Sequence, residues 1–77
     1  NDIENIEFKV YPNPAMNSVT ISTIETVEKI NIYSMQGILV KETIINETID
    51  VSNLASGMYF IEIISGKIKS VQKLIKI

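Results

Sequence analysis

The sequence has no cysteine, histidine or tryptophan. Without cysteine it has neither disulfides nor thiolate zinc ligands, and without histidine it lacks the commonest general base. These absences exclude most hydrolase sites. Nine carboxylates remain, but a chain of 77 residues can hardly form the cleft that a catalytic pair needs. We therefore expect no catalytic residue, metal ligand or cofactor, and predict that the chain is not an enzyme.

Charge and hydrophobic runs restrict the partners. The net charge is −2 and the pI about 4.9, which argues against binding to nucleic acid, because such binding requires a strong positive field. No apolar run approaches the roughly 18–20 residues that span a bilayer, and the N-terminus lacks the pattern of an export signal. We interpret residues 1–7 as the end of a linker to an upstream domain, and residues 8–77 as one domain cut from a longer protein.

What the sequence does have is 45% hydrophobic residues, mainly isoleucine and valine, whose branched side chains suit strands. Alternation of apolar and polar residues predicts seven short strands, over residues 6–10, 19–22, 27–35, 38–40, 49–51, 58–64 and 70–77. The run at 58–64 is the most apolar, so we expect it at the centre of a sheet. Seven short strands with frequent turns predict an all-β, immunoglobulin-like β-sandwich of antiparallel strands.

Proline and glycine mark the turns. Pro12 and Pro14, around Asn13, fix the backbone and predict a rigid turn. Gly57 lies two residues before Tyr59 at the start of a long apolar strand, a spacing that resembles a tyrosine corner. In that feature the phenol hydrogen-bonds backward across the turn, so we predict a structural role for Tyr59.

The charges are unevenly distributed along the chain. The last eleven residues contain four lysines and no acid, whereas the first 66 contain three lysines and nine acids. One interpretation is that these lysines protect an exposed edge strand from pairing with other chains. The other is that the basic C-terminal hairpin is a handle that a receptor reads by strand addition. An exposed edge could also allow self-association through strands.

Two further functions are compatible with a small sandwich. A carbohydrate-binding module needs a platform of exposed aromatic side chains, and we expect the core or a corner to claim at least three of the five aromatics. A structural spacer of fibronectin type would need no site at all. The glycosylation-like triplet at residues 46–48 is interpreted as a polar turn.

Four short motifs occur in a particular order: YPNP at residues 11–14, IYSMQG at 32–37, LASGMYFI at 54–61 and KLIK at 73–76. Together they resemble the type IX (Por) secretion system C-terminal sorting domain, type A, of secreted Bacteroidota proteins, over roughly residues 8–77. In that family an aspartate usually occupies the position of Ser34. The residues that carry the resemblance as fold determinants are Pro12, Asn13, Pro14, Gly37, Leu54, Gly57 and Tyr59.

The resemblance implies a transport signal. The cargo would cross the periplasm, and this domain would direct it through the outer-membrane type IX translocon to the outer membrane, cell surface or medium. Implied partners are translocon components, an outer-membrane shuttle barrel and a sortase-like cysteine peptidase, which removes the domain and anchors the cargo to lipopolysaccharide. The residues expected to be recognised by the receptor are Gly66, Lys67, Lys73, Leu74, Ile75, Lys76 and Ile77.

Overall fold

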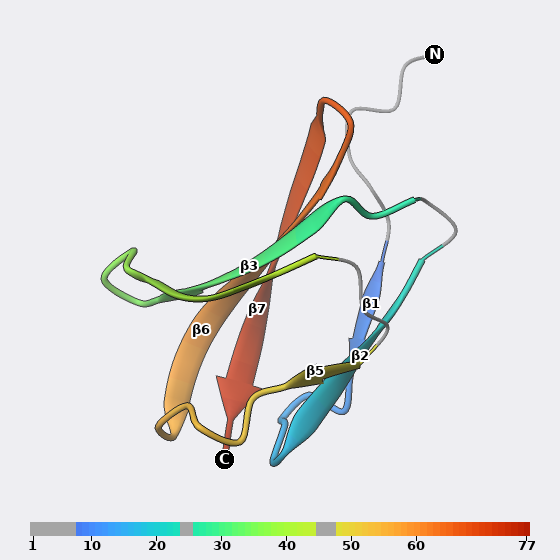
Figure 1. Ribbon diagram of the computed structural model, residues 1–77. Helices are drawn as coiled ribbons and strands as arrows, with labels where there is room; N and C mark the ends of the chain where they lie inside the picture. The colour runs from blue at the N-terminus through green and yellow to red at the C-terminus, as the bar shows by residue number, and fades with distance from the viewer. Residues whose placement is uncertain (1–7, 24–25, 45–47) are drawn as a thin grey trace.

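The computed structural model describes residues 8–23, 26–44 and 48–77. The strands are β1 (Lys9–Tyr11), β2 (Ser18–Ser22), β3 (Lys29–Ser34), β4 (Leu39–Thr43), β5 (Thr48–Asp50), β6 (Gly57–Ser65) and β7 (Ile68–Lys76). They form an antiparallel three-stranded sheet with the order β1-β2-β5 and an antiparallel four-stranded sheet with the order β4-β3-β6-β7 (Figure 1). The prediction of an all-β, immunoglobulin-like sandwich is confirmed. The described residues include no helix with the length and hydropathy of a membrane span.

The core lies between the two sheets, where the inward-facing residues of the alternating strands meet. Ile32 and Ile61, cross-strand partners on β3 and β6, are both fully buried, as is Val19 of the opposite sheet. The core residues are Phe8, Val10, Ala15, Val19, Ile21, Ile30, Ile32, Ile49, Val51, Tyr59, Ile61, Ile63 and Leu74. As predicted, β6 is an inner strand of its sheet, because it lies between β3 and β7.

Some strand boundaries differ from the predicted ones. The fourth strand was expected over residues 38–40, but β4 covers Leu39–Thr43 and Ile38 is exposed before it. The extension is polar, so its periodicity gave no strand signal. It is a strand because Lys41–Thr43 pair with residues of β3. The start of the predicted first strand, at residues 6–7, lies outside the described residues.

The predicted tyrosine corner is confirmed. The Tyr59 hydroxyl donates a hydrogen bond of 2.7 Å to the Ala55 carbonyl, four residues upstream, and the ring is buried. Gly57 between them has a φ of 152°, a conformation that is strained for a residue with a Cβ. The corner therefore fixes the chain at the point where it enters β6.

Ser34 occupies the position at which the family that the sequence resembles usually has an aspartate. Its Oγ accepts hydrogen bonds of 3.2 Å from the backbone amides of Gln36 and Ile38, which is what an aspartate carboxylate would do in the same turn. The Gly37 amide donates to the Ser34 carbonyl at 2.9 Å, and Gly37 has a φ of 84°. A serine thus holds the turn between β3 and β4.

Candidate functional site

The C-terminal hairpin contains most of the residues expected to be recognised. Strands β6 and β7 pair without a register shift from Gly57–Lys76 to Ser65–Ile68. The turn between them contains Gly66, whose φ of 62° favours glycine, and the exposed Lys67. In Figure 1 this turn lies at the end of the sandwich opposite the C-terminus.

The alternation of β7 divides the predicted recognition residues into two groups. Lys73, Ile75 and Ile77 are exposed, whereas Leu74 is fully buried and Lys76 is 9% exposed. Of the adjacent apolar residues Leu74 and Ile75, Leu74 is the one that packs in the core. Gly66 and Lys67 are also exposed, so the exposed members of the predicted set lie at the two ends of the strand.

Lys76 has a local partner. Its Nζ donates a hydrogen bond of 3.1 Å to the carbonyl oxygen of Ile77. Since the side chain is buried, it contributes less to the surface charge of the hairpin than Lys67, Lys69 and Lys73, which are all exposed.

The turn of the Pro-Asn-Pro motif contacts the end of β7. Both proline peptide bonds, after Tyr11 and after Asn13, are cis. The Asn13 side-chain amide donates to the Lys73 carbonyl at 3.0 Å, and its oxygen accepts from the Ile75 amide at 3.0 Å. One side-chain amide thereby takes the place of a backbone peptide group beside β7. The predicted rigid turn has a definite role, since it presents Asn13 to the C-terminal strand.

Ala15 continues this contact as a short parallel bridge. Its amide donates to the Ile75 carbonyl at 2.7 Å, and its carbonyl accepts from the Ile77 amide at 2.8 Å. The methyl group is fully buried, so a larger side chain would not fit without displacement. We call the segment Asn13–Ala15 the clasp. It makes four hydrogen bonds with the end of β7, between Lys73 and Ile77.

Gln72 makes a second connection between the first and last strands. Its Nε2 donates to the Phe8 carbonyl, just before β1. Gln72 points inward on β7, on the same face as Leu74. The C-terminal strand is thus connected to the segments on both sides of β1.

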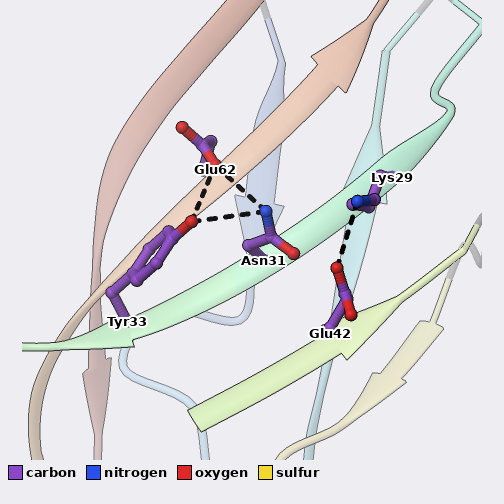
Figure 2. Close-up of polar contacts among 5 residues, drawn as sticks. All are labelled: Lys29, Asn31, Tyr33, Glu42 and Glu62. Atoms are coloured by element: carbon purple, nitrogen blue, oxygen red, sulfur yellow. Dashed lines mark hydrogen bonds and ion pairs between the residues drawn. The ribbon is translucent and has the colours of Figure 1, made fainter. Parts of the chain in front are cut away.

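A polar cluster lies on the outer face of the four-stranded sheet (Figure 2). The Asn31 Nδ2 donates to Glu62 Oε1 at 3.1 Å and contacts the Tyr33 hydroxyl at 3.4 Å, and that hydroxyl donates to the same Glu62 oxygen at 3.2 Å. Beside it, Lys29 Nζ lies 3.1 Å from Glu42 Oε2. Both partners of this ion pair are nearly half exposed, so it contributes at most about 1 kcal/mol.

Asn31 is the buried member of this cluster, at 6% exposure. Its Oδ1 is buried without a hydrogen-bond partner among the described residues. Rotating the amide would place that oxygen against the Glu62 carboxylate, so the observed orientation is the favourable one. Partial desolvation and the Glu62 carboxylate raise the pKa of Tyr33 above its ordinary value.

Sequence reasoning missed three of these contacts. The hydrogen bonds of Asn13, the link from Gln72 to Phe8 and the cluster around Asn31 all join residues at least 29 positions apart or depend on strand register. The alternation of β3 puts Asn31 and Tyr33 on the face opposite Ile30 and Ile32, but only the pairing of β3 with β6 brings Glu62 beside them. In the described part of the chain no three carboxylates gather as a metal site would require.

Comparison with known proteins identifies the chain. The family described as the secretion system C-terminal sorting domain matches residues 9–77. The chain is 36% identical to Beta-agarase D of Zobellia galactanivorans over 58 residues, which are 74% of this chain and 12% of the agarase. It therefore spans only a small part of the relative that it matches. The chain belongs to the family of secretion system C-terminal sorting domains, the non-catalytic tails that serve as the secretion signal for type IX sorting.

Proposed function

We propose that the type IX machinery recognises this sorting domain through the exposed side chains at the two ends of the C-terminal hairpin. We further propose that the receptor is an outer-membrane shuttle barrel. The observation that carries this proposal is the surface at the end of the chain's last strand, where Lys73 and Ile75 of β7 and Ile77 directly after it are exposed while Leu74 anchors the strand in the core. The turn at Gly66 and Lys67 adds an exposed cation at the other end. The clasp fixes the backbone that carries Lys73 and Ile75, through the hydrogen bonds of Asn13.

The steps around recognition follow from the same role. The cargo crosses the periplasm with this domain attached, and the domain then engages the translocon. A sortase-like cysteine peptidase removes it in or before the linker at residues 1–7 and anchors the cargo to lipopolysaccharide. The domain itself contributes no chemistry to these steps, in keeping with its non-catalytic family.

The argument against a carbohydrate-binding module is weaker than the sequence suggested. At least three aromatics were expected in the core or corner, but only Phe8 and Tyr59 are buried. Tyr33 and Phe60 are half-buried cross-strand partners, and Tyr11 is exposed. A glycan array with the isolated domain tests this alternative, whereas the spacer alternative predicts normal export after any surface change in the hairpin.

The test is a fusion of residues 1–77 to the C-terminus of a periplasm-targeted fluorescent protein in a type IX competent bacterium. We expect the fusion to reach the surface or medium, and to stay in the periplasm of a translocon-deficient strain. A stable, folded fusion that stays inside the competent strain would contradict the proposal.

Deletion of residues 73–77 is expected to abolish export, but it also removes Leu74 from the core and all partners of the clasp. A sharper variant changes only exposed groups, as in the double substitution Ile75→Ser and Ile77→Ser. The matched control is Met16→Ser, which also removes an exposed apolar side chain. The proposal predicts loss of export for the double variant alone.

A further inference from the structure

The backbone edge of β7 that faces away from β6 has two different halves. Backbone groups of alternate residues in a strand point to the same side. Ile75 uses both its amide and its carbonyl on the clasp, so the groups of Val71 and Lys69, which share its parity, also face away from β6. Across residues 8–23, 26–44 and 48–77, no backbone hydrogen bond to these two residues is made on that side.

The side chains along this open half form a regular row. Lys69, Val71 and Lys73 lie at alternate positions on the outer face, and all three are exposed, Val71 at 54%. In the described ranges no carboxylate forms an ion pair with either lysine. The nearest acid across the pairing is Glu62, the partner of Val71, and its Oε1 is occupied by Asn31 and Tyr33.

We propose that the open half of β7, from Lys69 to Lys73, binds an extended acidic segment of another protein by strand addition. The segment places carboxylates opposite Lys69 and Lys73 and a small apolar side chain opposite Val71, and its backbone pairs with the free groups of Lys69 and Val71 and with the amide of Lys73. This rests on the proposed function only in taking the secretion machinery as the source of the segment. The binding site itself is inferred only from the backbone edge and the exposed side chains of β7.

The clasp and the lysines restrict which strand can pair with the open half of β7. An added strand ends at Lys73, because Asn13 already occupies the carbonyl of that residue. A second copy of β7 fits poorly, since antiparallel pairing about Val71 places Lys69 of each copy opposite Lys73 of the other. Like charges directly opposite one another in a sheet are destabilising. The same lysines favour an acidic partner for the same reason.

The probe is a synthetic peptide with blocked ends and the sequence Thr-Glu-Thr-Val-Thr-Glu-Thr. Its glutamates and valine fall at alternate positions, and the pattern reads the same in both directions, so it matches Lys69, Val71 and Lys73 in either orientation. The control peptide replaces both glutamates with glutamine. The measurement is a titration of the isotopically labelled 77-residue chain followed by amide chemical shifts.

We expect saturable shifts centred on the amides of Lys69, Val71 and Lys73, and binding about three to ten times weaker for the glutamine peptide. The difference between the peptides should shrink at high salt. Val71→Pro should abolish binding while leaving the β6–β7 ladder intact, because the amide that it removes faces away from β6. Val71→Ala keeps that amide and should still bind, and Lys9→Gln, a change of an exposed lysine elsewhere, should bind as the parent does.

Several results would overturn the proposal. These are no shift up to millimolar peptide, equal binding of the two peptides, or unchanged binding by a folded Val71→Pro variant. Anionic lipid vesicles that shift the same amides equally in the parent and in Val71→Pro would indicate a general anion surface in place of a strand site. Sedimentation that shows a dimer lost in Val71→Pro would assign the edge to a second copy. Because the titration contains no secretion machinery, export of the fusion stays an independent result.

Discussion

The two halves of β7 have the same alternating pattern of side chains, but they differ in the hydrogen bonding of their outer backbone edge. From Lys73 onward the outer backbone edge is bonded to the clasp, and Leu74 anchors the strand in the core. Before Lys73, within the part of the chain that the structure describes, the outer edge carries no backbone hydrogen bond at Lys69 and Val71, and Val71 is exposed. The difference comes from the Pro-Asn-Pro turn, some 60 positions earlier in the chain. The first and last motifs of the family are thus parts of one structural unit.

The comparison explains why a recognition strand can be both firm and accessible. An unpaired edge at the very end of a chain would fray, because terminal residues are poorly ordered unless they are tied down. The clasp ties the terminal residues and leaves the outward side chains of Ile75 and Ile77 free. The open half is held instead by its pairing with β6.

The largest expected effect contrasts Leu74→Ala with Val71→Ala. Leu74 is fully buried between the sheets, so its truncation leaves a cavity and should lower the free energy of unfolding by about 2–5 kcal/mol. Val71 is exposed, and its truncation should cost less than about 1 kcal/mol. Urea denaturation measures both. Equal costs would mean that the two halves are not packed as described.

The next effect removes the clasp's side-chain contact. Asn13→Ala deletes the donor to the Lys73 carbonyl and the acceptor for the Ile75 amide, and should destabilise the domain by about 1–2 kcal/mol. Hydrogen exchange should become faster at the Ile75 amide and stay unchanged at the Ser70 amide, which faces β6. A uniform acceleration along β7 would contradict a local clasp.

Asn13→Asp separates the two hydrogen bonds of the same side chain. An aspartate keeps an acceptor for the Ile75 amide but places a carboxylate oxygen against the Lys73 carbonyl. At neutral pH we expect it to be at least as destabilising as Asn13→Ala. If it matches the parent in stability, the donor bond to Lys73 contributes nothing.

A smaller effect concerns the tyrosine corner, which lies beside the half of β7 that the clasp binds. Tyr59 is the cross-strand partner of Leu74, and its hydroxyl bonds to Ala55. Tyr59→Phe keeps the buried ring and loses one hydrogen bond, so we expect a loss of about 0.5–1.5 kcal/mol. Thermal unfolding checks this, with Tyr11→Phe, which removes the hydroxyl of an exposed tyrosine, as the matched control. A neutral result would mean that the ring alone fixes the corner.

The smallest effect is a pH dependence far from β7. Hydrogen bonds from the Ser52 hydroxyl and amide lower the pKa of the exposed Asp50 carboxyl. Its contribution to stability is therefore complete above the ordinary carboxyl range and is lost as the pH falls through the lowered pKa. Asp50→Asn should flatten this part of the acid unfolding curve. The clasp uses only amide and carbonyl groups, so protection of Ile75 should not follow the same titration.

Much of the fold could be predicted from the sequence, because its determinants are local. Alternation located the inward residues of β2 and β3, the apolar run predicted that β6 is central, and the glycine-tyrosine spacing predicted the corner at Tyr59. The polar end of β4 could not be predicted, since only its pairing with β3 makes it a strand. Local pattern could not predict the clasp either.

The candidate site was predictable in part for the same reason. Composition located the cationic hairpin, and alternation allowed only one of Leu74 and Ile75 to face the core. That Lys76 is buried and that the edge beside Ile75 is occupied depend on Ala15 and Asn13, which approach from the start of the chain. Whether the exposed residues contact the receptor remains a prediction for the export assay.

In our proposal the secretion machinery reads the exposed surface of the C-terminal hairpin, and not the fold alone. The most direct test compares export of two fusions, one with Lys73→Glu and one with Lys9→Glu, after urea denaturation has shown that both are as stable as the parent. Each replaces one exposed lysine on a strand. We expect reduced export for Lys73→Glu and normal export for Lys9→Glu. Normal export of both fusions would contradict the proposal.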